Sequence, residues 1–129
     1  MINYLLQLGL SENDIKKIND FDDKLLYEDI DDIEKIVFLL KDIGMNENSI
    51  KEMIICNPMI LNRTYEDVNQ LILKLKEYNF DSINFLLEAN PFFVNYDAYE
   101  IDDYYNLKNK SIQEITESIE NNPYIMEEY

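Results

Sequence analysis

The chain has 129 residues, of which 47% are hydrophobic, and this composition is sufficient for one globular domain with a buried core. Its 27 acidic residues outnumber 11 basic ones, which gives a formal net charge of −16 at pH 7. Such a charge repels nucleic acid and anionic membranes, and it favours either plain solubility or a basic partner. The sequence has no histidine and one cysteine, which excludes internal disulfides and histidine-based catalysis.

Apolar residues recur at spacings of three and four along most of the chain, which is typical of amphipathic helices. The pattern predicts no strand and eight helices, at residues 2–8, 11–18, 30–42, 47–56, 65–78, 82–89, 98–106 and 112–121. Ser11, with Asp14 three residues later, and Asn46 have the side chains expected at the first positions of two of these helices. A short apolar element, with Phe21, Leu25 and Leu26, is expected before the third helix.

The two glycines of the chain open matching segments, LGLSENDI and IGMNENSI. Gly9 and Gly44 each follow a predicted helix, at the position where the left-handed conformation favours a residue without a Cβ atom. Asn79 lies 35 residues after Gly44, and asparagine is the next best residue for that conformation. We therefore expect Asn79 to end its helix as Gly44 does.

The chain has three prolines, and each follows an asparagine: Asn57-Pro58, Asn90-Pro91 and Asn122-Pro123. The prolines are separated by 33 and 32 residues. A proline disfavours the helical conformation in the preceding residue and suits the first position of a new helix. We expect each asparagine to end a helix in left-handed geometry, directly before a short helical turn.

Backbone signals repeated at this spacing indicate an array of similar units, because periods of 20–50 residues are typical of solenoids. We predict a single domain over residues 1–129, with an all-α fold. The predicted architecture is a helical-repeat solenoid of about four three-helix units, forming a curved superhelix with a concave binding surface.

The repeat is visible in the segments LGLSENDI, IGMNENSIKEMIICNPMIL, NFDSINFLLEANPFFV and SIQEITESIENNPYIM. It resembles the repeat of the mTERF family, the mitochondrial transcription termination factors and their relatives. This resemblance implies two antiparallel helices and a short third helix, introduced by proline, in each unit. It also implies nucleic-acid binding through basic residues on the concave face. The chain departs from that pattern, since it has a single arginine, Arg63, and no basic stripe, so we expect no nucleic-acid binding.

The acid-rich stretch from Asp20 to Glu34 invites comparison with a calcium-binding EF-hand loop. Such a loop needs an acid at its fifth position, glycine at its sixth and glutamate at its twelfth. Counted from Asp20, these positions hold Lys24, Leu25 and Asp31, so the motif is not met.

Cys56 stands beside two isoleucines without a histidine base, and we expect a buried structural thiol. Together these observations predict no catalytic residues, no metal ligands and no cofactor, and therefore a protein that is not an enzyme.

Six tyrosines gather in the last third of the chain: Tyr96, Tyr99, Tyr104, Tyr105, Tyr124 and Tyr129. Tyrosine is favoured in interface hot spots, although half-buried packing at the end of an array explains such rings equally well. The candidate partner-binding residues are acidic or aromatic: Asp29, Asp31, Asp32, Tyr99, Asp102, Asp103, Tyr104 and Tyr105.

These features predict a non-enzymatic protein-interaction module whose acidic surface binds a basic protein partner. An alternative is an acidic mimic of nucleic acid that inhibits a nucleic-acid-binding protein, of a phage or mobile-element type. A third is a nucleic-acid binder like the mTERF family. Apolar runs are too short to span a membrane and the N-terminus lacks a basic secretory region, so we expect a cytoplasmic protein without a membrane partner. The abundance of asparagine, isoleucine, lysine and tyrosine suggests an A+T-rich bacterial or phage genome.

Overall fold

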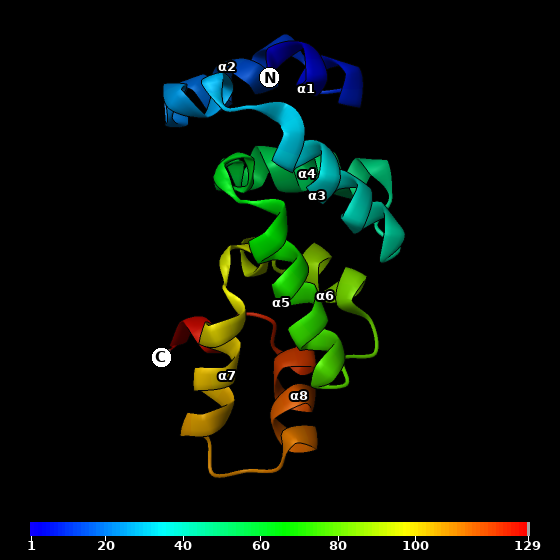
Figure 1. Cartoon of the computed structure of the whole chain (residues 1–129), viewed down its shortest axis with the longest axis vertical. Coiled ribbons are helices and arrows are strands. Elements are labelled where there is room, and N and C mark those ends of the chain that lie inside the picture. Colours follow the sequence, from blue (N-terminus) through cyan, green and yellow to red (C-terminus); the bar gives the residue numbers. More distant parts are fainter. Residues whose placement is uncertain (129) are drawn as a thin grey trace. The chain divides into compact units, whose positions relative to one another are not determined.

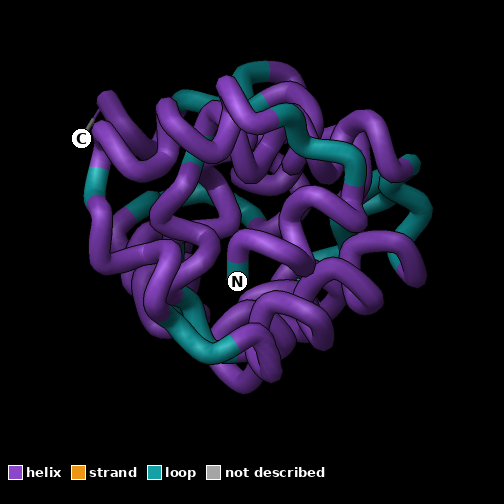
Figure 2. The backbone as a smooth tube through the Cα atoms, turned by 90° about the horizontal axis from the view of Figure 1, so that it is seen from above, coloured by secondary structure: helices purple, strands orange, loops and turns teal. Residues whose placement is uncertain are grey.

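The computed structural model describes residues 1–128, which form short helices joined by loops (Figure 1). The α-helices are α1 (Ile2–Leu8), α2 (Glu12–Phe21), α3 (Ile30–Asp42), α4 (Glu47–Cys56), α5 (Tyr65–Glu77), α6 (Ile83–Ala89), α7 (Ala98–Leu107) and α8 (Ile112–Asn121). Four 3-10 helices accompany them: η1 (Asp23–Tyr27), η2 (Pro58–Asn62), η3 (Pro91–Asn95) and η4 (Ile125–Glu128). Residues 1–128 contain no strand (Figure 2), which confirms the all-α prediction. Tyr129 lies outside the described residues.

The predicted helices agree with the structure except at a few ends. The largest difference is in α2, which continues to Phe21 and ends at Asp22 in an extended conformation. Phe21 therefore belongs to α2, where it is 58% exposed, and not to the short apolar element that follows. That element is η1, which buries Leu25 and Leu26.

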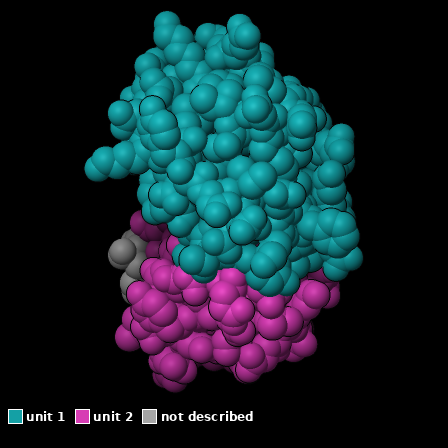
Figure 3. All heavy atoms as spheres, turned by 45° about the horizontal axis from the view of Figure 1, so that its top comes forward, with its two compact units in different colours: residues 1–65 teal, residues 66–129 magenta. Residues whose placement is uncertain are grey.

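Contacts along the chain group it into two compact units (Figure 3): unit 1, Met1–Tyr65, and unit 2, Glu66–Tyr129. Unit 1 holds α1 to α4 with η1 and η2, and unit 2 holds α5, from Glu66 onward, to η4. The single domain expected from the sequence stays a prediction.

The core of unit 1 receives apolar side chains from each of its four α-helices. Fully buried examples are Leu5, Ile18, Ile36 and Ile54. The two 3-10 helices of the unit pack against each other, and each buries a pair of consecutive apolar residues, Leu25 and Leu26 or Ile60 and Leu61. Only the second of these turns begins with a proline, Pro58, whereas η1 begins at Asp23.

The predicted N-caps are confirmed. The Ser11 hydroxyl accepts from the backbone N–H of Asp14 at 3.1 Å, and the Asp14 carboxylate accepts from the N–H of Ser11 at 2.9 Å. This reciprocal pair is a capping box, which satisfies two backbone donors at the start of α2. The Asn46 side chain accepts from the N–H of Ser49 at 2.8 Å at the start of α4.

Three helices end in the same left-handed geometry, as predicted: Gly9 has φ 102°, Gly44 has φ 103° and Asn79 has φ 65°. The following residue in each case donates its N–H to the carbonyl five positions earlier: Leu10 to Leu5, Met45 to Leu40 and Phe80 to Leu75. All six residues in these bonds are buried. Each end is thus a Schellman motif with buried apolar residues on both sides, which stops the helix and turns the chain back over the core.

The Asn-Pro corners also end helices, but the expected left-handed geometry is wrong. The φ angles of Asn57, Asn90 and Asn122 are −130°, −133° and −140°. The reason is the proline ring, which clashes with a helical conformation in the preceding residue and favours an extended one. The first two prolines begin η2 and η3, whereas Pro123 lies in a turn before η4 begins at Ile125.

Asn90 joins two of these corners inside unit 2. Its side-chain amide donates to the carbonyl of Pro123 at 2.9 Å and to the Glu127 carboxylate at 3.3 Å. Its Oδ1 atom accepts from the N–H of Phe92 at 3.0 Å. Because Asn90 is completely buried, these bonds replace water for every polar atom of the side chain.

Replacing Asn90 with alanine is expected to lower the free energy of unfolding by about 2–4 kcal/mol, because the Pro123 carbonyl and the Phe92 N–H lose their partner. Urea denaturation of the full chain measures the change. Asn106→Ala, at an exposed position of α7, is the control and should stay within about 0.5 kcal/mol. Equal effects of the two substitutions would contradict the role of the buried amide.

A second pair of variants tests which face of α5 is buried. Leu71 is completely buried, whereas Leu73, on the same helix, is 47% exposed. Leu71→Asp is expected to cost about 3 kcal/mol or more, since it places an unpaired carboxylate among apolar neighbours. Leu73→Asp should cost less than about 1 kcal/mol. Thermal denaturation distinguishes them, and similar melting temperatures would contradict the assigned face.

Candidate functional site

Acidic side chains cover the surface of both units. Among the carboxylates that the structure describes, every one is exposed or half-exposed and none is buried. Unit 2 carries 14 acids against 4 bases, and unit 1 carries 13 against 7. Most of the negative charge therefore belongs to unit 2, whose formal charge is −10 against −6 for unit 1.

The three acidic candidates of unit 1 lie at the start of α3 and are exposed. Asp29 is the N-cap of α3, since its carboxylate accepts from the N–H of Asp31 at 3.1 Å. The Asp32 carboxylate accepts from the N–H of Tyr65, the first residue of α5, at 2.9 Å. Two of the three acids thus bind backbone donors at helix starts, where a carboxylate also favours the positive end of the helix dipole.

The structure separates the candidates of α7 into two groups. Tyr99 is 64% exposed and Asp103 is exposed, so both face solvent. Tyr104 and Tyr105 are each only 6% exposed. These two rings are therefore packed within unit 2, which is the alternative to a role in an interface. Their faces are already covered and are not open to a partner.

Asp102 is the centre of a polar network that joins α5 to α7. The Tyr78 hydroxyl donates to its Oδ1 atom at 2.5 Å, and Lys74 Nζ lies 3.2 Å from its Oδ2 atom. Lys74 also pairs with Glu77 at 3.0 Å. A short bond from a hydroxyl to a carboxylate is among the stronger hydrogen bonds in proteins. Asp102, a candidate partner-binding residue, therefore helps to hold α5 and α7 together.

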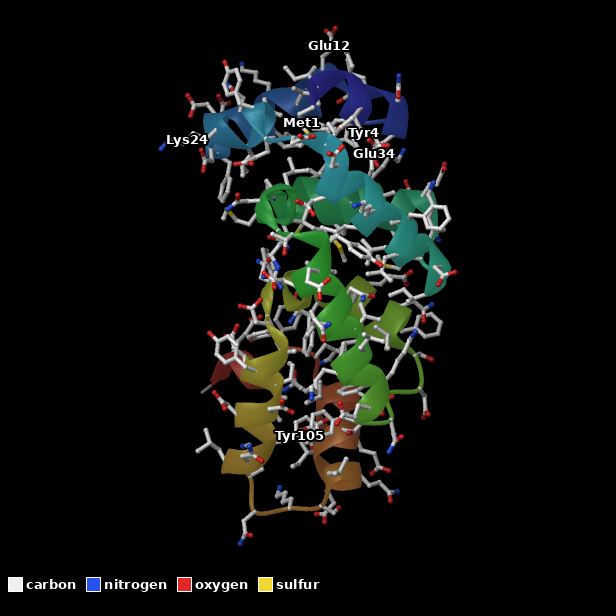
Figure 4. All side chains as sticks on the ribbon, in the orientation of Figure 1. Met1, Tyr4, Glu12, Lys24, Glu34 and Tyr105 are labelled. Atoms are coloured by element: carbon white, nitrogen blue, oxygen red, sulfur yellow. The ribbon has the colours of Figure 1, made fainter. Side chains whose placement is uncertain are left out.

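The network continues through aromatic rings to α8. Tyr78 and Tyr105 are stacked, with ring centroids 3.9 Å apart and planes 5° from parallel. Tyr105, which lies between α7 and α8 (Figure 4), shares a hydrogen bond of 2.7 Å with the hydroxyl of Thr116. Thr116 in turn donates to the carbonyl of Tyr78 at 2.8 Å. One continuous set of contacts therefore holds α5, α7 and α8 together.

These contacts shift the pKa values of the network in opposite directions. Burial raises the pKa of Tyr78 to about 12, and its bond to Asp102 acts in the same direction. The hydrogen bond from Tyr78 lowers the pKa of Asp102, and Lys74 lowers it further. The network therefore contains an ionised carboxylate and a neutral phenol at neutral pH.

The sequence pattern did not indicate that Lys74, Tyr78 and Thr116 belong to one network. One usable signal exists for Thr116, which sits beside Ile115 on the buried face of α8 and is itself 4% exposed. A hydroxyl on a buried face needs a partner. The identity of that partner depends on how α5, α7 and α8 pack together. The spacing of residues along one helix does not give this information.

Asp102→Asn is expected to remove a pH-dependent part of the stability. Because the pKa of Asp102 is lowered on folding, its contribution is present above the ordinary value of 3.8 and is lost as pH falls through the lower folded value. The difference in unfolding free energy between the native chain and the variant should therefore shrink as the solution is acidified. Urea denaturation at several pH values measures it, and a difference that stays constant would exclude the ionised carboxylate as the cause.

A hollow of about 370 Å³ lies where the α5–α6 loop meets α8 in unit 2. Its lining includes three carboxylates, those of Asp81, Glu117 and Glu120, together with Tyr78 and the half-exposed Ile112. Thr116 of the polar network forms part of the same wall. The lining of the hollow therefore combines acidic side chains with aromatic and apolar ones.

A second hollow, of about 300 Å³, is lined by residues of α6, by Glu120 of α8 and by Pro123. Glu120 lines both hollows, so we treat them as one feature and name it the α6–α8 groove. The apolar side of the second hollow includes Phe85, which is 65% exposed, and Pro123. None of the described residues that line the groove is basic.

Unit 1 has a hollow of a different kind, with a volume of about 500 Å³. Phe38, which is 76% exposed, Leu39 and Tyr65 provide its apolar lining. Its charged residues are one lysine, Lys35, and one aspartate, Asp42. Since these opposite charges balance, this hollow has no clear preference for a charged ligand.

Cys56 is exposed at the end of α4, so the expectation of a buried thiol is wrong. Its neighbours Met53 and Ile54 occupy the buried face of that short helix and Cys56 falls outside it. Within residues 1–128, no group of three or more histidine, cysteine, aspartate or glutamate side chains is arranged to hold a metal ion. No helix in the same range has the length and apolar character needed to cross a membrane.

Comparison of the chain with protein-family models and with curated proteins gives no match.

Proposed function

We propose that this chain is a non-enzymatic protein-interaction module whose acidic surface binds a basic protein partner. The observation that carries the proposal is the placement of charge. The formal net charge is −16, every carboxylate whose exposure the structure describes is exposed or half-exposed, and unit 2 contains only four bases to offset its 14 acids. A surface of one sign accelerates encounter with a partner of the opposite sign and repels nucleic acid.

The repeat architecture is part of the same proposal. Three Schellman ends follow each other at intervals of 35 residues, at Gly9, Gly44 and Asn79. Asn-Pro corners recur at 33 and 32 residues with similar backbone angles. These regularities support a helical-repeat solenoid of about four three-helix units of the mTERF-like type, with the acidic surface in place of the basic one. We assign this module to the cytoplasm.

The proposal predicts no binding of the full chain to mixed-sequence duplex DNA or structured RNA at near-physiological salt. Fluorescence anisotropy of labelled nucleic acids measures this directly. The expected absence of binding follows from long-range repulsion, since non-specific affinity for nucleic acid comes mainly from neutralising phosphates with basic side chains. Sub-micromolar binding that weakens as salt is added would contradict the proposal and favour the function of the mTERF family.

The partner itself is tested by affinity capture from the source cell, followed by binding measurements with the purified candidate. The expected partner is basic, and its association rate should fall as salt rises, because steering by charge is screened. Capture of an acidic partner with salt-independent association would contradict the proposal. The partner could instead be a nucleic-acid-binding protein that DNA displaces from the chain. That result would favour the alternative function, an acidic mimic of nucleic acid, over a general interaction module.

A further inference from the structure

We propose that the α6–α8 groove is the docking site for a basic, amphipathic peptide segment of the partner. This inference rests on the proposed function and assigns it to one place on unit 2. Arginine or lysine side chains of the segment pair with Asp81, Glu117 and Glu120, and its apolar side chains cover Phe85 and Ile112.

Charge within the groove is entirely of one sign. Glu117 and Glu120 lie three residues apart on α8, and Asp81 lines the same hollow from the α5–α6 loop. Carboxylates one helical turn apart repel each other, so a cation between them relieves an unfavourable interaction. The sequence adds no compensating base, because neither the stretch from Glu77 to Leu107 nor that from Ser111 to Tyr129 contains lysine or arginine.

The apolar residues of the groove favour a ligand that also carries apolar groups, and not a simple cation. Phe85 is 65% exposed and Ile112 is 50% exposed, and both line the groove. Arginine and lysine have long apolar stems that lie along such surfaces while the charged ends reach carboxylates. An amphipathic segment with leucine-like residues beside its bases therefore matches the groove better than a uniformly charged one does.

Both walls of the groove are held in place before any segment binds. Thr116 ties the middle of α8 to the end of α5 through its bond to the carbonyl of Tyr78. The buried Asn90 ties the end of α6 to Pro123, directly after α8. A preformed groove avoids the entropic cost of ordering on binding, which favours affinity for a short segment.

A second copy of this chain fits the groove poorly. Its formal charge is −16, and both of its units are negative. Association of two copies at an acidic groove brings like charges together, whereas a basic segment brings opposite ones. Charge complementarity therefore selects a different, basic protein as the occupant.

The test uses two fluorescent 12-residue peptides, titrated against the full chain by anisotropy. The first contains arginine, leucine and glutamine, with the leucines at helical spacing. In the second, glutamine replaces each leucine, so its charge is the same. The native chain is expected to bind the first peptide at least about fivefold more tightly than the second, because only the first can cover Phe85 and Ile112.

Two matched pairs of variants assign the binding to the groove. The double variant Glu117→Gln with Glu120→Gln is expected to weaken the first peptide about tenfold. The control, Glu28→Gln with Glu52→Gln, changes the net charge equally at exposed positions of unit 1 and should stay within about twofold. Phe85→Ala should weaken the first peptide and leave the second unchanged, whereas Phe38→Ala, at the exposed phenylalanine of unit 1, should change neither.

The outcomes separate this inference from the function on which it rests. Equal weakening by the two double variants would overturn the docking site, because charge alone would then bind the peptide, and the proposed interaction module would stand. No binding of the first peptide up to about 1 mM would also overturn the docking site. Failure of affinity capture to yield any basic partner would remove the proposed function as well. Self-association in sedimentation velocity that Phe85→Ala abolishes would overturn the inference in favour of a second copy.

Discussion

The α-helices described in this chain have 7 to 13 residues, and helices of this length are marginally stable in water on their own. Each therefore depends on burying one apolar face against its neighbours, and that burial succeeds only if the helix ends at the right residue. Schellman ends and Asn-Pro corners set those ends. At Gly44, for example, the left-handed residue lies between Leu40 and Met45, which are both buried, so a single backbone feature stops the helix and closes the core.

Part of the negative charge of the protein also stabilises its helices. Some carboxylates stabilise the fold directly: Asp29 caps α3, Asp32 binds the first N–H of α5, and Asp102 accepts from Tyr78. Lys74, one of the few bases of unit 2, is used between Glu77 and Asp102. Lys74 is engaged by these two carboxylates, and none of the described residues that line the α6–α8 groove is basic, so the lining of the groove keeps its negative charge.

The exposure of the candidate residues could be predicted only in part, and the particular residues show why. Tyr99 and Asp103 face solvent as a partner-binding surface requires, whereas Tyr104 and Tyr105 of the same helix are buried. The sequence of α7 does not contain the position of α8, whose Thr116 contacts the buried Tyr105. The groove was not foreseen for the same reason, because Phe85, Glu117 and Glu120 come from two helices that are adjacent only after folding.

The sequence by itself determined the all-α fold, the helix boundaries to within a few residues and the sign of the surface charge. These properties are local or additive: apolar spacing selects a helix, glycine and proline restrict their own backbone and that of a neighbour, and formal charges sum without regard to position. Tertiary structure decided the hydrogen bonds that the buried amide of Asn90 makes, the exposure of Cys56 and the partner of Thr116. It also decided which carboxylates share one groove. Each of these depends on distances between segments remote in the chain, and such distances exist only once the helices have packed.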